Sequence, residues 1–409
     1  MFARLKNNLY LWRFFRSRAV RKLPLKILWQ FWRLMQREKV TKFNGQIMIN
    51  YFLPPFPSSS FERYLKNLLH IYHKKEFLPK DLIISLTNRC PYHCGYCYNE
   101  YTKGVDLAWP EIKKVIDYFN HLGIFKIGLS GGEPLLRDDL EKIIKYIVDR
   151  GISVTLSTTG YGLDKKRAVS LKKSGLTSIQ ISLDHYQEET GDGKEQEQKS
   201  LPIAIEGLKA SIEAGLYASA SLTVTNQTAK DDFFNKYVDF VESLGVPEIR
   251  AFEIKPTGRI VAQAGTEKFL SQEQRKKIIA WQRTVNDDPT RKIRVFMHNY
   301  YEDKNFLGCQ AGVNYFYIDA DGNVRPCVFS ALSLGNIKTE GLDKICLRFK
   351  KYFSYPRTTC LAFDSHQAII NNFNGELPLP REISETILEN TPKTGLPNFY
   401  KKIMDNTFF

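Results

Sequence analysis

Three cysteines, Cys90, Cys94 and Cys97, lie within eight residues of a 409-residue chain. Their C-x3-C-x2-C spacing places three thiolates on one segment, and closely spaced thiolates bind a soft metal ion or an iron–sulfur cluster. A structural zinc site prefers four ligands, usually as two separated pairs. His93 could supply a fourth zinc ligand, but it adjoins Cys94 and is an awkward partner. The spacing favours a four-iron cluster that keeps one iron open for a small chelating ligand.

A glycine-rich stretch, Ser130-Gly-Gly-Glu-Pro134, follows an apolar run at 126–130. Glycines let the backbone approach a ligand closely, and carbonyls together with Glu133 can accept hydrogen bonds from an ammonium group. Taken alone, the stretch could be a tight turn, and polar residues at strand ends are often ordinary turn residues. Comparable polar groups end three later apolar runs: Ser157, Thr158, Thr159 and Gly160; Ser182 and Asp184; and Lys255-Pro-Thr-Gly-Arg259.

In this order, the motifs resemble those of the radical S-adenosylmethionine (SAM) enzymes over about residues 80–260. Tyr96 is the aromatic residue that the family places before its third cysteine, and Gly131–Pro134 matches its GGEP motif. The resemblance implies that Cys90, Cys94 and Cys97 hold a catalytic [4Fe-4S] cluster. It also implies SAM contacts from Tyr96, Gly131, Gly132, Glu133, Pro134, Ser157, Thr159, Ser182, Asp184 and Arg259.

The chemistry implied by the resemblance is radical generation. The open iron would bind the amino and carboxylate groups of SAM, and an electron from a donor such as ferredoxin or flavodoxin would cleave the sulfonium carbon–sulfur bond. The resulting 5′-deoxyadenosyl radical would abstract hydrogen from the substrate. The cofactor supplies this chemistry, while the protein orients the reactants and excludes water.

Four more cysteines lie near the C-terminus. The spacing Cys309-x12-Gly322-x4-Cys327 resembles the opening of the auxiliary-cluster extension called SPASM or twitch. Asp321-Gly322 is typical of a hairpin, which would bring two thiolates together. The resemblance implies Cys309, Cys327 and Cys360 as ligands of one auxiliary iron–sulfur cluster.

Two cysteine alternatives remain open at this point. Cys346 is either a fourth ligand or a buried thiol, and all four C-terminal cysteines could be plain core residues. His366 lies near Cys360 but is expected to be a core or surface histidine. An odd total of seven cysteines favours metal binding in a reducing compartment over a disulfide framework.

Strands and helices that alternate along the chain must position these motifs. Apolar strand-like runs recur at 81–87, 126–130, 152–157, 178–183, 217–224 and 248–254, and helical patterns recur at 109–121, 138–149, 164–173, 202–214 and 231–243. The alternation predicts an α/β fold with a parallel sheet, open or curved, and ligand chemistry at the carboxyl ends of its strands. The resemblance narrows this to a partial (β/α)6 barrel of the radical SAM type.

Five segments follow from these patterns. They are a basic amphipathic helical arm at 1–45, a connector at 46–79, the radical SAM core at 80–260, a small α+β auxiliary domain at 261–370, and a C-terminal tail at 371–409.

The arm carries most of the charge. The chain has a formal net charge of +15, and residues 1–42 hold twelve basic side chains against one acidic one, so eleven of these charges lie there. After Pro24, one helical stripe holds Lys26, Gln30, Arg33 and Arg37. The opposite face holds Leu25, Leu28, Trp29, Trp32 and Met35, widened by Ile27, Phe31 and Leu34. Tryptophan and cations on opposing faces suit a helix lying in a membrane interface.

Two other uses of the arm are open: docking on the protein's own body, and nucleic-acid binding, which the nearly neutral remainder makes the least favoured. The sequence contains no run of 18 apolar residues, so it predicts no membrane-spanning helix. We therefore expect a cytoplasmic enzyme, peripheral on the inner membrane face, that binds an anionic surface and a lipid or other membrane-borne substrate. The alternative is a peptide maturase, and the remote one a nucleic-acid-binding protein with a structural cluster. No nucleic-acid partner is expected.

Overall fold

The computed structural model describes residues 14–17, 20–35, 38–99, 104–187, 194–195, 200–261 and 269–405. Within them a nine-stranded sheet has the order β11-β10-β9-β7-β6-β5-β3-β12-β13. Every neighbouring pair is parallel except β12 and β13. The strands are β3 (Asp81–Ser85), β5 (Lys126–Ser130), β6 (Ser153–Thr158), β7 (Ser178–Ser182), β9 (Tyr217–Val224), β10 (Glu248–Glu253), β11 (Arg294–Met297), β12 (Tyr315–Ile318) and β13 (Val324–Arg325).

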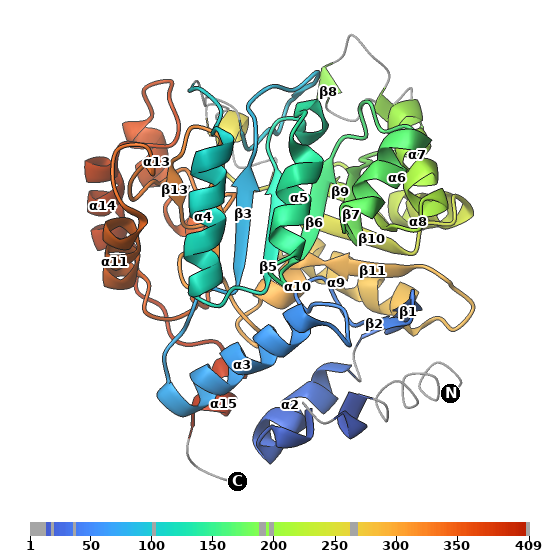
Figure 1. Cartoon of the computed structure of the whole chain (residues 1–409), viewed down its shortest axis with the longest axis horizontal. Coiled ribbons are helices and arrows are strands. Elements are labelled where there is room, and N and C mark those ends of the chain that lie inside the picture. The colour runs from blue at the N-terminus through green and yellow to red at the C-terminus, as the bar shows by residue number, and fades with distance from the viewer. Residues whose placement is uncertain are drawn as a thin grey trace.

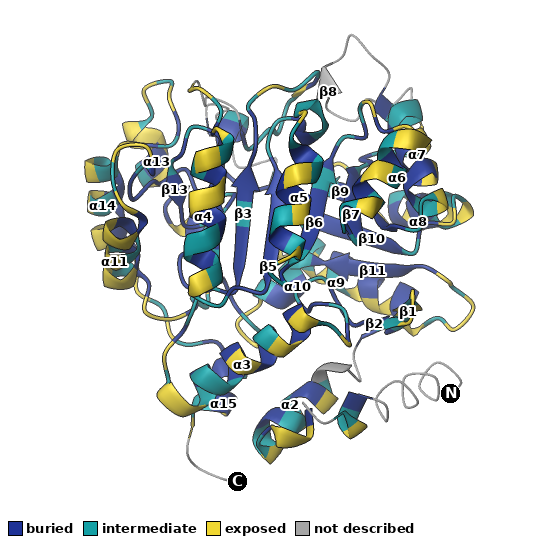
Figure 2. Cartoon of the chain, in the orientation of Figure 1, coloured by how far each residue is buried: buried dark blue, intermediate teal, exposed yellow. Residues whose placement is uncertain are grey.

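Helices cover the outer face of this sheet, and the strands turn from upright β3 to nearly horizontal β10 and β11 (Figure 1). The helices are α4 (Trp109–His121), α5 (Leu140–Val148), α6 (Lys165–Lys173), α7 (Ser200–Glu213), α8 (Asp231–Ser243) and α9 (Gln272–Asp287). Their outer faces are exposed while the strands are buried, as expected of a parallel sheet behind amphipathic helices (Figure 2). The six predicted strands and five predicted helices are confirmed, as is the radical SAM type of α/β fold.

One strand at the edge of the nine-stranded sheet was missed. The segment 261–300 was predicted to be mostly helical, and α9 and the short α10 (His298–Glu302) fit this, but β11 extends the sheet beyond β10. It contains only four residues, Arg-Val-Phe-Met, between charged stretches. A run that short gives too little periodicity to separate a strand from a helix end.

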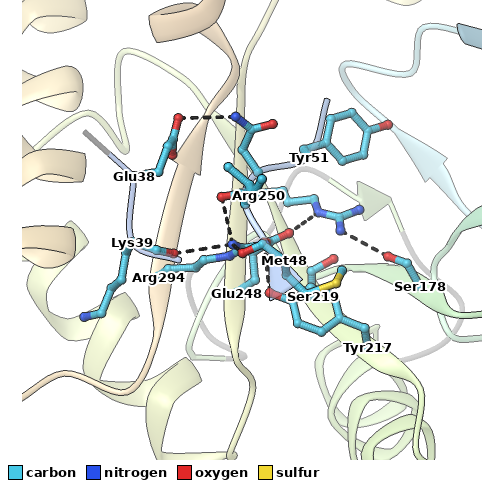
Figure 3. Close-up of polar contacts among 12 residues, drawn as sticks. Glu38, Lys39, Met48, Tyr51, Ser178, Tyr217, Ser219, Glu248, Arg250 and Arg294 are labelled. Atoms are coloured by element: carbon cyan, nitrogen blue, oxygen red, sulfur yellow. Dashed lines mark hydrogen bonds and ion pairs between the residues drawn. The ribbon is translucent and has the colours of Figure 1, made fainter. Parts of the chain in front are cut away.

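The amino ends of the strands are closed by a buried ionic network (Figure 3). Glu248 of β10 pairs with both Arg250 and Arg294. Arg294 also donates to the carbonyls of Met48 and Ile49, at 2.8 and 3.0 Å. The start of the connector is therefore fixed under the sheet. The hairpin of β1 (Thr41–Phe43) and β2 (Gln46–Met48) joins it to the arm, whose last residues form β1 rather than the predicted helix.

The C-terminal part forms a small α+β unit beside β3. The predicted hairpin is confirmed: β12 and β13 pair antiparallel around Gly322, whose φ of 93° favours glycine. Asn88 Nδ2 donates to Asp321 Oδ1 at 2.6 Å, which ties this hairpin to the segment carrying the first three cysteines. The helices here are α11 (Leu342–Tyr352), α12 (Leu361–Asp364), α13 (His366–Asn372) and α14 (Arg381–Asn390).

The described part of the arm docks on the body, which was one of the uses left open for it. In α2 (Leu25–Met35), Ile27 and Phe31 of the predicted apolar face are buried, so this part of the face is not available to a membrane. They belong to a cluster with side chains of α3 (Ser59–Lys74) and Ile403 of α15 (Asn398–Met404). The segment predicted as a tail thus supplies two helices, α14 and α15, because its apolar residues find partners far back in the chain.

A second apolar face of α2 stays outside. Leu25, Trp29 and Trp32 are 76%, 54% and 42% exposed, and the two indole rings stack with centroids 4.9 Å apart. The arm residues before Phe14, and Arg18 and Arg37, lie outside the described residues. No helix in the described ranges has the length and apolar character needed to cross a membrane.

Candidate active site at the carboxyl edge of the sheet

The segment that follows β3 carries Cys90, Cys94 and Cys97. All three are half-buried thiols, and they line one cavity of about 520 Å³. Among the described residues, no three His, Cys, Asp or Glu side chains are grouped so as to hold a metal ion. A four-iron cluster is larger than a single ion and takes its thiolates at wider separations, so the thiol-only donor set fits a cluster better than zinc.

Gly131 and Gly132 also line this cavity. A Cβ atom added at Gly132 would lie 2.3 Å from the carbonyl oxygen of Arg89, and one at Gly131 would lie 2.6 Å from that of Thr87. The amide of Gly132 donates to the Thr87 carbonyl at 2.7 Å. The two glycines therefore let the backbone after β5 pack directly against the segment leading to Cys90, besides lining the cavity.

Glu133 was predicted to accept a hydrogen bond from an ammonium group. Its side chain is fully buried, is not part of the cavity wall, and is fully engaged. The carboxylate accepts from the amides of Leu135 and Thr159 and from the hydroxyls of Thr158 and Thr159, at 2.6 to 2.9 Å. Burial raises the pKa of Glu133, against the effect of these donors. In this structure the residue joins the ends of β5 and β6, and Pro134 lies behind the wall with it.

The polar residues that end β6 and β7 reach the cavity as predicted. Ser157, Thr159, Ser182 and Asp184 all line it. Asp184 accepts from the Tyr96 hydroxyl at 2.5 Å and from the Thr223 amide at 2.6 Å. Its carboxylate therefore fixes the aromatic residue of the cysteine segment to the middle of the sheet.

Arg259 was predicted to contact SAM, but it does not line the cavity. Its amide donates to the Cys97 carbonyl at 2.9 Å, and its guanidinium reaches the His93 carbonyl at 3.4 Å. A Cβ atom at Gly258 would lie 2.1 Å from the Cys97 carbonyl oxygen. The stretch after β10 thus supports the cysteine segment from behind.

Cys309, Cys327 and Cys360 line the same cavity from the C-terminal unit. A hydrogen bond from the Cys309 thiol lowers the pKa of Cys360 to about 6, and the nearby Lys255 charge acts in the same direction. Burial raises the pKa of Cys327 to about 12. Three thiols facing one space, two of them in contact, fit an iron–sulfur cluster, which would hold them as thiolates.

The other two C-terminal candidates lie elsewhere. Cys346 is on α11, outside the cavity wall, and interacts with Tyr118. The residue is half-buried and lies apart from the three thiols that line the cavity. His366 packs edge-on against Phe269, with ring centroids 5.6 Å apart.

Sequence reasoning missed a buried charged group in the cavity wall. Lys255, at the end of β10, forms an ion pair with Glu302 of α10. His298 lies 3.4 Å from the same carboxylate, and all three residues line the cavity. Lys255 is the first residue of the motif that ends in Arg259, so the sequence did contain a signal that Lys255 belongs to a functional site. Glu302 sits in a segment with no motif, so only the fold brings the two together.

The cavity therefore holds two thiol sets, polar strand ends that can bind a nucleoside and an amino acid, and an ion pair between them. The profile of the radical SAM superfamily matches residues 84–233, and that of an iron–sulfur cluster-binding domain, SPASM, matches residues 309–361.

Two curated relatives illustrate the range of activities. A GTP 3′,8-cyclase of Aquifex aeolicus is 31% identical over 61% of this chain and 82% of its own length. An AdoMet-dependent heme synthase of Oleidesulfovibrio alaskensis is 25% identical over 67% of this chain and 75% of its own.

Solved structures agree on the fold. Streptococcus suis SuiB bound to SAM superposes with a TM-score of 0.55 and 15% identity, covering 71% of this chain and 70% of SuiB. The enzyme anSMEcpe with bound AdoMet gives a TM-score of 0.53 and 17% identity, covering 67% of this chain and 83% of its own. With these matches, the chain belongs to the radical SAM superfamily, as an enzyme that uses a [4Fe-4S] cluster, SAM and auxiliary iron–sulfur chemistry in a C-terminal SPASM domain.

Proposed function

We propose that this radical SAM enzyme acts on a lipid or another membrane-borne molecule at the cytoplasmic face of a membrane. The observation that carries the proposal is the outward face of α2. Leu25, Trp29 and Trp32 form an exposed apolar row on a helix whose other face is anchored in the body. Large exposed apolar side chains gathered in one place mark an interaction surface.

Exposed cations precede α2 and lie on a helix packed against it. Arg21 and Lys22 are exposed just before α2, and Lys401 and Lys402 are exposed on the neighbouring α15. Tryptophan at the level of the headgroups, with lysine and arginine beside it, is the arrangement of an interfacial helix on anionic lipid. Because α2 is docked rather than free, insertion of the row would also orient the whole enzyme on the surface.

We assign the cofactor ligands as follows. Cys90, Cys94 and Cys97 hold the SAM-binding cluster, and Cys309, Cys327 and Cys360 hold the auxiliary one. When bound, the first cluster and SAM supply the radical that removes hydrogen from the substrate. The chain's own residues fix the geometry: Asp184 holds Tyr96, and Gly132 and Arg259 hold the cysteine segment. The electron would come from a ferredoxin or flavodoxin.

Flotation with liposomes of anionic lipid tests the surface assignment. Wild-type protein is expected to float, and Trp29→Ala/Trp32→Ala is expected to bind about tenfold or more weakly, because each indole contributes more than a kilocalorie of burial. Leu347→Ser is the matched control, since Leu347 is 67% exposed but lies on α11. Wild-type protein that stays unbound would remove the membrane proposal.

Peptide maturation is the second candidate. Its support is the fold shared with SuiB, solved with a precursor peptide at a TM-score of 0.56 and 14% identity. A small peptide gene beside the gene for this chain would favour it. The deciding assay is anaerobic reconstitution followed by 5′-deoxyadenosine formation with cell lipid extracts or with such a peptide. Cys94→Ala is expected to abolish SAM cleavage while part of the auxiliary cluster remains loaded, and cleavage at the wild-type rate would refute the ligand assignment.

A further inference from the structure

The cavity does not end at the cysteine edge. It continues to the amino ends of the strands, where Leu53, Tyr64, Leu68, Phe125 and Phe399 form an apolar lining. We call this part the base chamber. It is separated from the cysteine edge by the length of β3, five residues or about 17 Å. One continuous space thus connects the thiols with the opposite end of the barrel.

The base chamber shares a wall with the arm. Tyr64 and Leu68 of α3 and Phe399 of α15 also line a second, small cavity, whose other side is formed by Ile27, Gln30 and Phe31 of α2. Figure 1 shows α2, α3 and α15 side by side at this end of the molecule. The helix with the exposed tryptophans therefore docks on the outer wall of the base chamber.

A buried cation, Lys80, faces the base chamber. Lys80 is only 9% exposed and lines the cavity, and its ammonium donates to the Tyr400 hydroxyl at 3.3 Å. No carboxylate among the described residues forms an ion pair with it. The contrast is Lys126 at the start of the next strand, whose ammonium lies 2.8 Å from Asp81. Tyr400 cannot serve as the counter-ion, because its hydroxyl is neutral and donates to Gln310.

An unpaired ammonium in an apolar chamber is costly, and a ligand anion would relieve that cost. Burial lowers the pKa of Lys80 to about 7, which agrees with a group whose contacts, the Tyr400 hydroxyl and ring, carry no charge. The lining around it is mostly apolar. Its polar members include Asn50, Gln310 and Asn314, and the Asp81 carboxylate there is already paired with Lys126. The matching ligand therefore has one acidic group on an apolar body. A membrane surface supplies molecules of this kind.

We propose that the base chamber binds the carboxylate of a long-chain, fatty-acid-like amphiphile, with Lys80 as its counter-ion and the chain running through the cavity toward the cysteine edge. The inference rests on the lipid substrate proposed above. The acidic end lies at the α2 end of the cavity, and the tail points toward the cysteine edge. Hydrogen abstraction then takes place about 17 Å along the chain from the acidic group.

The test uses the full chain, anaerobically reconstituted with SAM present, and two fluorescent probes: cis-parinaric acid and its methyl ester. The wild type is expected to bind the acid about tenfold or more tightly than the ester, since a charge-assisted hydrogen bond separates them. Lys80→Met is expected to remove this preference while keeping the affinity for the ester, and Lys80→Arg to keep the preference. Lys66→Met, an exposed site on α3, is the matched control.

A second variant guards against a folding artefact. Leu68→Trp fills the base chamber, and it is expected to weaken binding of both probes while its thermal unfolding remains cooperative. The acid preference should persist in Trp29→Ala/Trp32→Ala, because surface adsorption does not create it. Equal wild-type affinity for the two probes, no binding of either, or a preference that survives Lys80→Met overturns the inference.

The two proposals fail separately. If liposome flotation and lipid-dependent SAM cleavage succeed while the probes show no acid preference, only the base chamber assignment falls. If the acid preference holds but the wild type ignores liposomes and lipid extracts, the membrane function falls and a carboxylate site on this chain remains.

Discussion

The ammonium of Lys255 lies 3.3 Å from the sulfur of Cys360. Lys255 is buried and also paired with Glu302, so this contact is held from two sides. Burial opposes a charged lysine, but Cys360 and Glu302 outweigh it and raise the pKa of Lys255. A fixed positive charge and a hydrogen bond to a ligand sulfur both favour the reduced form of an iron–sulfur cluster.

Replacing Lys255 by Met is therefore expected to lower the reduction potential of the auxiliary cluster. A charge-assisted hydrogen bond of about 1.5–3 kcal/mol corresponds to roughly 60–130 mV for one electron. The measurement is a potentiometric titration followed by electron paramagnetic resonance, in a chain whose Cys90, Cys94 and Cys97 are alanine. Lys255→Arg should stay near the wild-type potential. The double variant Lys255→Met/Glu302→Gln also removes the lysine charge, but it leaves no unpaired buried carboxylate. An unchanged reduction potential in both Met variants would show that Lys255 does not tune the auxiliary cluster.

Gly132 gives a prediction about cluster assembly. Gly132→Ala places a Cβ atom against the Arg89 carbonyl, so the segment leading to Cys90 must move. We expect iron and sulfide per chain to fall by about one cluster's content after reconstitution, while the auxiliary cluster still loads. Gly341→Ala is the control, because nothing lies within 4 Å of its added Cβ. Full loading of Gly132→Ala would mean that the close approach is not needed for the first cluster.

The parts of the fold that the sequence predicted have local causes. Apolar strand-like runs that alternate with amphipathic helical patterns predict β3 to β10 and their helices. Asp321-Gly322 predicts the hairpin because its turn needs a residue with positive φ. The cysteine segment was readable because its ligands are neighbours in the chain. In each case a short window of sequence contains the whole physical reason.

The parts that were missed depend on distant partners. Lys255 and Glu302 are 47 residues apart, and Lys80 and Tyr400 are 320 apart. The sequence around Lys80 does not show that its side chain is buried or that it has no carboxylate partner among the described residues. The two apolar faces of α2 are both visible in its sequence, but only the positions of α3 and α15 decide that Ile27 turns inward and Trp29 outward.

Glu248 predicts acid sensitivity at the base of the barrel. Burial alone would raise its pKa, but Arg294 and Arg250 outweigh this and lower it to about 2. A depressed carboxyl pKa stabilises the fold above the unfolded value near 4.5, and that contribution is lost as the pH falls toward 2. In Glu248→Gln we expect a loss of about 3–5 kcal/mol at pH 7, because two buried guanidiniums lose their charge partner.

Urea unfolding at several pH values measures this. The wild type should lose free energy of unfolding between about pH 4.5 and 2, and Glu248→Gln should lose less over the same interval. Glu273→Gln, on an exposed side chain of α9, should follow the wild type. Parallel pH profiles of Glu248→Gln and wild type would show that the network does not control acid unfolding.

Glu38 predicts the opposite pH dependence. It is 6% exposed, and burial raises its pKa to about 7, against hydrogen bonds from Tyr301 and Asn50. A raised carboxyl pKa gives stability that is present below the unfolded value near 4.5 and lost as the pH rises through 7. Glu38→Gln keeps an acceptor for Tyr301 but cannot ionise, so its free energy of unfolding relative to wild type should rise by roughly 3 kcal/mol between pH 4.5 and 8.

Thermal unfolding across this range measures the gain, with exposed Glu206→Gln as the control. Because Glu38 joins the arm to the base of the barrel, a constant difference between variant and wild type across the range would mean that it stays ionised there at every pH.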